Sequence, residues 1–429
     1  MSIELLQTKL NIPSARTDLV ARPQLLQRLD EGLTRKMILV SAPAGFGKTT
    51  LLANWVQGLA ATLRLQVEGP QGSQNERRST NLRPSGVAWL SLDEGDNDPA
   101  RFWSYLITAL QNVDQRIGKN SRKMLSARQP ASLESILTAF INEISSSSRQ
   151  IVLALDDYHL ITTPKIQQAM AFILENLPGN LHLVISTRTD PPVPLARLRA
   201  RDQLVEIRAA DLRFSREEIG SFFLREAGGR LQEADVRALE SRTEGWVAGL
   251  QLAALAVQRQ ADPSDFIQNF AGDNRYIVDY LAQEVLEGLP EEDRDFLLKT
   301  SILERICAPL CEFVTGQKSA QEKLERLEGA NLFLTPVDGT RTWYRYHNLF
   351  ADFLRHQLEA TRSEILPELH RRASSWFEAQ DFGTQAIEHA LSARDYARAA
   401  RLIEDTARST FVLENTRPCS AGWMPYRVR

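Results

Sequence analysis

A glycine-rich loop between a short apolar run and a helical pattern constrains this chain most. The stretch MILVSAPAGFGKTTLLANW, residues 37–55, follows the phosphate-loop pattern G-x-x-x-x-G-K-[ST], with Ala42 in place of the first glycine. Alanine is tolerable there if the position keeps a negative φ. The run before the loop has the composition of a buried parallel strand, and apolar residues recur at helical spacing after it. Strand, loop and helix in this order predict an α/β domain that binds a nucleotide by its phosphates.

The residues of this loop have separate predicted roles. Gly45 and Gly47 let the main chain curl so that successive N–H groups point at phosphate oxygens. Lys48 is expected to reach the β- and γ-phosphates, and the Thr49 hydroxyl to bind Mg²⁺. The helix opened by Thr49 and Thr50 directs the positive end of its dipole at the same anions. The predicted nucleotide-contacting residues are Ala44, Gly45, Phe46, Gly47, Lys48, Thr49 and Thr50.

Two acids follow a second apolar run, RQIVLALDDYHLI. In a phosphate-loop protein a second strand delivers a carboxylate to the metal, so Asp156 is predicted to hold Mg²⁺ through water. Asp157 is predicted to polarise the attacking water. Two acids after a strand also occur at ordinary exits into turns. Their pairing with the phosphate loop favours the metal and catalytic roles.

An arginine follows a third apolar run, LHLVISTRTDPP. At the carboxyl end of a parallel strand beside the nucleotide, Arg188 can sense the γ-phosphate. The alternative, an exposed arginine before a Pro-Pro loop, stays open on these residues.

Strands and helices alternate from Met37 to Arg208, which predicts a parallel sheet with helices on both faces. We therefore expect a nucleotide-binding domain over residues 1–212. Residues 65–86 are polar and aperiodic, and are expected to be a flexible insertion in that domain. The pattern then becomes helical, starting with a capping box at Ser215 and Glu218, and predicts a helical domain over residues 213–275.

Three further segments are expected after the helical domain. Helices followed by two strands around Asp338-Gly339 predict a winged-helix domain over residues 276–362. It shows no basic recognition helix, which favours an internal packing role over DNA binding. Paired amphipathic helices over residues 363–412 are typical of the start of a tetratricopeptide-like solenoid. Residues 413–429 leave that pattern and read as an aberrant or disordered tail.

Composition limits the classes of protein and the cell compartments that this chain fits. The net charge of −3 over 429 residues provides no general field that would recruit nucleic acid or a membrane. No signal peptide and no membrane-spanning run is read in the sequence. Cys307 and Cys311 have no second ligand pair nearby, so buried thiols are favoured over a metal site. We expect a cytoplasmic protein without a membrane partner.

Six stretches carry a resemblance to a known family, and the likeness as a whole runs from about residue 5 to about residue 406. The chain resembles the large ATP-dependent transcription activators of the MalT/LuxR type, which belong to the AAA-like signal-transduction ATPases with numerous domains. The stretches are APAGFGKTTLL, VAWLSLDEGDNDPARFWSYLITAL, LALDDYHLI, STRTDPPVPLARLRARDQLVEIRAADLRF, TEGWVAGLQLAALA and YRYHNLFADFLR.

The resemblance implies a switch with ATP or ADP and Mg²⁺ as ligands. ADP-bound monomers of such proteins rest, inducer and ATP favour a self-associating form, and slow hydrolysis resets the switch. It also implies that a winged-helix histidine, here His347, touches the β-phosphate. The family pattern is Met-His-Asp, whereas this chain has Tyr346-His347-Asn348, so a capping or core histidine stays an equal alternative.

The resemblance further implies two C-terminal parts that are typical of the family. A full solenoid binds a small-molecule inducer and a C-terminal helix-turn-helix binds DNA, and both are expected to be missing from this chain. The sequence does not identify the inducer, the target genes or the oligomer. A second function stays open: a P-loop ATPase or kinase with steady turnover on an unidentified substrate. Such an enzyme would need an acid, a base or groups that bind the acceptor substrate. The sequence indicates no such groups beyond the phosphate site.

Overall fold

The computed structural model describes residues 5–14, 19–68, 84–125, 132–226, 231–258 and 263–415. By its internal contacts the chain forms two units. The first is Met1–Phe270 together with Gly329–Leu332, and the second is Ala271–Glu328 together with Phe333–Arg429.

The first unit contains a five-stranded parallel sheet in the order β2-β3-β4-β1-β5. Every residue of β1, β3 and β4 is buried, which explains why these strands read as continuous apolar runs. The phosphate loop leaves β1, and the two candidate acids and the candidate arginine follow β3 and β4. The strands are β1 (Met37–Ser41), β2 (Gly86–Ser91), β3 (Ile151–Asp156), β4 (Leu181–Thr187) and β5 (Leu204–Arg208).

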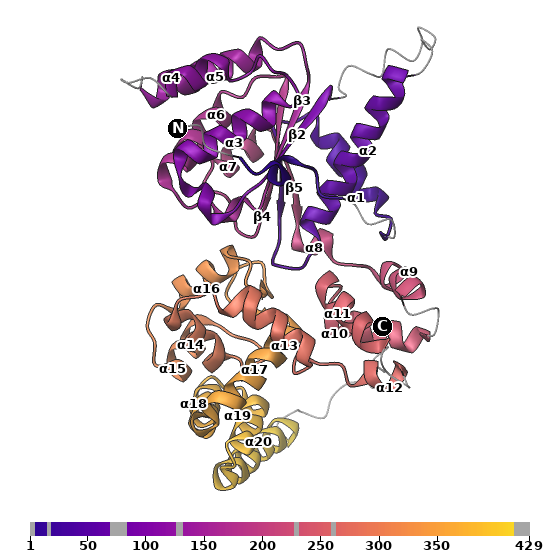
Figure 1. The fold of residues 1–429 in the computed structure, drawn as a ribbon. Helices are drawn as coiled ribbons and strands as arrows, with labels where there is room; N and C mark the ends of the chain where they lie inside the picture. The colour runs from indigo at the N-terminus through magenta and orange to yellow at the C-terminus, as the bar shows by residue number, and fades with distance from the viewer. Residues whose placement is uncertain are drawn as a thin grey trace. The chain divides into compact units, whose positions relative to one another are not determined.

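Helices cover both faces of this sheet, as the sequence predicted (Figure 1). Alternate residues of β1, β3 and β4, among them Leu39, Leu153 and Ile185, share one apolar core with three helices. These are α3 (Pro99–Gln111), α5 (Leu133–Ser145) and α6 (Pro164–Glu175). On the other face lie α1 (Pro23–Gly32) and α2 (Lys48–Glu68). The remaining helices are η1 (Gln7–Leu10), η3 (Glu94–Asn97), α4 (Lys119–Leu125), η4 (Tyr158–Leu160), α7 (Leu195–Ala200) and α8 (Ala209–Leu212).

Four helices complete the first unit after the sheet: α9 (Arg216–Glu226), α10 (Glu233–Thr243), α11 (Val247–Val257) and α12 (Pro263–Gln268). The capping box before α9 is present, because the Ser215 N–H donates to the Glu218 carboxylate at 2.9 Å. The Glu218 N–H donates back to the Ser215 hydroxyl at 3.3 Å. Gly245, just before α11, has a φ of +73°, and an added Cβ would lie 2.5 Å from the Phe214 carbonyl oxygen. Only glycine fits this turn without strain.

The second unit combines helices with one small hairpin. Strands β6 (Leu334–Pro336) and β7 (Tyr344–Tyr346) pair antiparallel, as the Asp338-Gly339 signal predicted. The Val337 N–H donates to the Trp343 carbonyl at 2.8 Å, which extends the hairpin past β6. The helices are α13 (Arg275–Leu281), η5 (Ala282–Leu286), α14 (Glu291–Thr300), α15 (Ala308–Thr315), α16 (Ala320–Gly329), α17 (Asn348–Arg362), η6 (Ser363–Ile365), α18 (Leu366–Ala379), α19 (Gly383–Ser392) and α20 (Tyr396–Asn415).

Two of the predicted irregular segments are only partly described. Helix α2 continues to Glu68 and β2 begins at Gly86, so both overlap the predicted insertion over residues 65–86. Residues 69–83 lie outside the described residues, as do residues 416–429 of the predicted tail. The described part of the chain contains no helix with the length and apolarity needed to cross a bilayer.

Cys307 and Cys311 are buried at the start of α15, and burial raises the pKa of both thiols. Within the described ranges, no three His, Cys, Asp or Glu residues gather as metal ligands. Both thiols are buried and pack as small core residues.

Candidate nucleotide-binding site

The phosphate loop has the backbone that its glycines predict. Gly45 and Gly47 each have a φ of +75°, a conformation that glycine adopts without cost. Ala42 keeps a negative φ, so alanine at the first position of the pattern introduces no strain. Helix α2 begins at Lys48, so its first N–H groups and the positive end of its dipole face the loop. The loop is therefore shaped to receive an anion.

Lys48 is folded into the loop. Its Nζ donates to the carbonyl oxygens of Ala42 at 2.8 Å and Pro43 at 2.9 Å, and the residue is 7% exposed. Burial lowers the pKa of Lys48 to about 8, and the positive charge of Arg188 acts in the same direction. The carboxylates of Asp157 and Asp156 oppose this shift. The fold thus gathers these four predicted site residues closely enough to interact electrostatically.

The side chains of Thr49 and Asp156 are in contact at the carboxyl edge of the sheet. Thr49 follows β1 and Asp156 ends β3, and β4 lies between these two strands. The Thr49 hydroxyl donates to the Asp156 carboxylate at 3.1 Å, and Asp156 is 2% exposed at the end of β3. Hydroxyl and carboxylate oxygens are the hard ligands that Mg²⁺ prefers, and Mg²⁺ commonly completes its shell with phosphate and water. The residues present therefore fit a magnesium ion held jointly by the protein and a nucleotide.

Asp157 and Arg188 lie at the same edge. Asp157 has a φ of +56°, a left-handed conformation that aspartate tolerates better than most residues. Arg188 follows β4, and its carbonyl accepts a hydrogen bond from the Asn331 side chain at 2.7 Å. Asn331 belongs to the short segment Gly329–Leu332 of the first unit. The catalytic roles predicted for Asp157 and Arg188 are not tested by these contacts.

His159 is a site residue that the sequence reasoning missed. Its Nδ1 lies 3.9 Å from an Asp157 carboxylate oxygen. Burial, with the charges of Arg188 and Lys48, lowers the pKa of His159 to about 3, so its imidazole is neutral at physiological pH. The signal in the sequence that could have identified His159 is its position directly after Asp156, Asp157 and Tyr158.

His347 lies in the second unit, where it precedes α17 as the N-cap residue and is 3% exposed. Its ring packs edge-to-face on Phe333 at 5.7 Å, and its backbone N–H donates to the Phe333 carbonyl at 2.8 Å. These contacts describe a packed core histidine, and contact with a nucleotide stays a prediction.

A cavity of about 470 Å³ adjoins the phosphate loop on the side of Gly47 and Thr50. The sequence reasoning placed no ligand there, because its walls come from segments far apart in the chain. Its lining is mostly apolar and includes three residues before α1, so it can accommodate the planar body of a base. The lining residues are Leu19, Val20, Arg22, Phe46, Gly47, Thr50, Leu51, Asn54, Leu212, Phe214, Phe222, Val247 and Gln251.

The start of α11 is hydrogen-bonded to the phosphate loop. The Trp246 indole N–H donates to the Ala44 carbonyl at 3.0 Å, and the Ala248 backbone N–H donates to the Gly45 carbonyl at 2.9 Å. Arg22, in the cavity wall, donates to the carbonyls of Leu212 at 2.7 Å and Arg213 at 2.8 Å. These bonds connect the loop, the cavity and the helices that follow the sheet.

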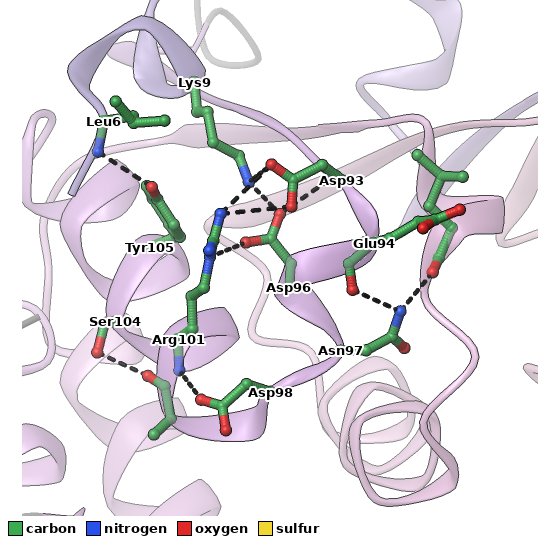
Figure 2. Close-up of polar contacts among 12 residues, drawn as sticks. Leu6, Lys9, Asp93, Glu94, Asp96, Asn97, Asp98, Arg101, Ser104 and Tyr105 are labelled. Carbon is green, nitrogen blue, oxygen red and sulfur yellow. Dashed lines mark hydrogen bonds and ion pairs between the residues drawn. The ribbon is translucent and has the colours of Figure 1, made fainter. Parts of the chain in front are cut away.

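An ionic network follows the end of β2, and Figure 2 shows its contacts. Lys9 pairs with Asp93 at 3.0 Å and with Asp96, and Arg101 pairs with Asp96 at 3.1 Å. Asp96 is fully buried, so its charge depends on these partners.

The segment held by this network contacts the residues around Asp156. The Leu92 N–H donates to the Asp156 carbonyl at 3.0 Å, and the Asn97 side chain donates to the Leu160 carbonyl at 2.7 Å. These two bonds connect the segment held by the network to the end of β3 and to the turn that follows it.

The chain is similar to known proteins over most of its length. Residues 282–366 match the MalT winged helix domain. The HTH-type transcriptional regulator MalT of Klebsiella pneumoniae is 36% identical over 403 residues, which cover 94% of this chain and 42% of that protein. The serine/threonine-protein kinase PknK of Mycobacterium tuberculosis is 35% identical over 394 residues, which cover 91% of this chain and 34% of that protein.

Among solved structures, the Walker-type ATPase PABY2304 of Pyrococcus abyssi has a similar fold, with a TM-score of 0.50 and 15% identity. The similarity covers 82% of this chain and all of that one. This chain spans about two fifths of the length of MalT and about a third of that of PknK.

Proposed function

Because this chain is a MalT-like signal-transduction ATPase of the P-loop class with a MalT-type winged helix, we propose that it acts as the ATP/ADP switch of a transcriptional regulator. The observation that carries the proposal is the Thr49–Asp156 contact of 3.1 Å beside a loop of positive-φ glycines. Slow hydrolysis resets the switch, and the ATP form favours self-association.

The proposed binding mode uses three parts of the first unit. The N–H groups over residues 44–50 and the Lys48 ammonium hold the phosphates. Thr49 and Asp156 hold Mg²⁺, which when bound neutralises charge on the phosphate oxygens. The base occupies the cavity beside Gly47 and Thr50. Because Trp246 bonds to the loop at Ala44, a change at the phosphates reaches α11 directly.

For hydrolysis we assign Asp157 as the group that polarises the attacking water and Arg188 as the sensor of the γ-phosphate. Neutral His159 lies beside Asp157 and adds no positive charge at physiological pH.

The other binding partners that we propose are those implied by the family resemblance. We propose that a small-molecule inducer and DNA bind parts of the longer relatives that this chain does not span. We place His347 at the β-phosphate of the resting form, and the protein in the cytoplasm. Steady turnover on a separate substrate gains no support within the described ranges, where the acids and bases near the loop are those of the phosphate site.

Retained nucleotide tests the proposal. The purified chain is denatured and the released ADP or ATP is quantified, and binding of added ATP is measured by equilibrium dialysis. Lys48→Ala should weaken ATP binding by at least about tenfold, or ~1.4 kcal/mol. Lys165→Ala, an exposed lysine on α6, is the matched control and should leave binding unchanged. Equal binding by both variants, or turnover above about 1 s⁻¹ without a partner, would contradict a switch.

A further inference from the structure

A second cavity, of about 470 Å³, lies within the second unit and plays no part in the proposed nucleotide switch. Its walls come from three places: the loop before α15, the β6–β7 hairpin, and α18 with α19. The charged and aromatic residues of its lining include Glu304, Arg305, Trp343, Phe382, Glu388 and His389. Its volume is typical of sites that bind small molecules.

Aromatic rings form one side of this cavity. Trp343 packs edge-to-face with Phe382 at 6.3 Å, and Phe377 packs edge-to-face with Phe382 at 6.1 Å. Phe382 is nevertheless 42% exposed, although water contact with so much apolar surface is unfavourable. The cavity therefore presents aromatic surface that a bound molecule would cover.

The charged residues of the cavity are predominantly acidic. Glu304, Asp338 and Glu388 supply three carboxylates, and Arg305 supplies one guanidinium, so the side chains sum to −2. Asp338 is occupied by the hairpin, because it accepts the backbone N–H groups of Thr342 at 2.9 Å and Trp343 at 3.3 Å. Glu304 and Glu388 form no ion pair with other residues that the structure describes.

The histidine in the wall does not offset this charge. His389 stacks on Phe377 at 5.4 Å with an interplanar angle of 7°, and its Nδ1 lies 2.8 Å from the Nδ1 of His370. Burial and the neighbouring His370 lower the pKa of His389 to about 4. At neutral pH this ring is an uncharged part of the aromatic wall.

We propose that this cavity binds a small organic cation, an alkylammonium or guanidinium compound. Aromatic faces attract cations through the ring quadrupole, and the carboxylates of Glu304 and Glu388 supply hydrogen-bond acceptors of the opposite charge. The alkyl body of such a ligand covers the exposed face of Phe382. An anion would meet net repulsion, and a neutral ligand would leave both carboxylates without a cationic partner.

Agmatine, which carries one ammonium and one guanidinium group, is the probe. Its binding to the full chain is measured by calorimetry at low salt, with a Kd below about 1 mM expected. The double variant Glu304→Gln/Glu388→Gln should weaken binding about tenfold or more. Glu364→Gln in η6, an exposed glutamate, is the matched control and should bind as the parent does.

Four further measurements make the result decisive. Circular dichroism of each variant checks that the fold is kept, and Trp343→Phe, which retains an aromatic ring, should bind agmatine within a fewfold of the parent. Lys48→Ala should bind agmatine as the parent does. The agmatine result can therefore be interpreted even if the proposed nucleotide switch is wrong. Equal binding of the neutral diol 1,4-butanediol, or agmatine binding that survives the double variant, would overturn the proposal.

Discussion

The indole N–H of Trp246 donates a hydrogen bond to the carbonyl of Ala44 at 3.0 Å, across 202 residues of sequence. Trp246 is fully buried and Ala44 is 6% exposed, so water cannot replace this bond. The carbonyl belongs to the phosphate loop and the indole to the turn before α11. The loop that would hold the phosphates is thus attached to the helices that follow the sheet.

Trp246→Phe keeps an aromatic ring but leaves the Ala44 carbonyl without its indole donor. We expect a loss of about 1–3 kcal/mol in the free energy of unfolding, the usual cost of a buried unsatisfied group. Chemical denaturation measures it. Trp55→Phe, which removes a 2.8 Å bond to Asp30 away from the loop, is the control. Both variants should lose stability, but only Trp246→Phe should weaken ATP binding. Equal ATP binding by the two would mean that the bond is structural only.

Asp156→Asn removes the carboxylate charge beside Thr49 and keeps the side-chain size. We expect ATP binding to lose most of its dependence on Mg²⁺, with affinity at saturating Mg²⁺ falling about tenfold, or ~1.4 kcal/mol. Dialysis with and without EDTA measures the dependence. Asp157→Asn is the companion variant and should keep Mg²⁺-dependent binding while slowing hydrolysis. Unchanged Mg²⁺ dependence in Asp156→Asn would remove that residue from the metal site.

The lowered pKa of Lys48 predicts a pH dependence of stability. Between pH 8 and 10.5 the unfolded chain keeps a proton on Lys48 that the folded chain has released. The free energy of unfolding should therefore rise with pH through this window, by an amount on the order of 2–3 kcal/mol for this residue. Below pH 8 both states carry the proton and this contribution to the slope vanishes.

Lys48→Met isolates that contribution, because the other titrating groups remain. Urea denaturation of parent and variant without nucleotide, from pH 7 to 10, should show the steeper rise in the parent. Parallel curves would show that Lys48 titrates normally. With phosphate added the difference should shrink, since a bound anion restores the pKa of the ammonium.

Gly245→Ala should destabilise the turn before α11. The φ of +73° and the 2.5 Å approach of a Cβ to the Phe214 carbonyl oxygen leave no room for a side chain, so we expect a cost of at least ~1–3 kcal/mol. Gly58→Ala in α2 has open space and a helical backbone, and should stabilise by up to ~1 kcal/mol. Thermal unfolding compares them, and a neutral Gly245→Ala would contradict the strained turn.

The amino-acid sequence by itself determined the local features of this protein. The glycines at 45 and 47 specify the positive-φ loop, and the continuous apolar runs specify buried parallel strands. The Ser215–Glu218 capping box and the hairpin around Asp338 were also predicted from the sequence. Each depends on residues within a few positions of one another, so propensity and spacing are enough to predict it.

Only the tertiary structure decided how distant residues come together, including Thr49 and Asp156, which the sequence analysis had assigned to one metal site. Thr49 and Asp156 meet because the strand order brings β1 and β3 to either side of β4, with their carboxyl ends at one edge. Leu19, Phe214 and Val247 form one cavity wall, and Trp246 reaches Ala44, only once α9 and α11 pack beside the loop. No local pattern encodes such contacts, since they depend on how whole elements bury their apolar faces against one another.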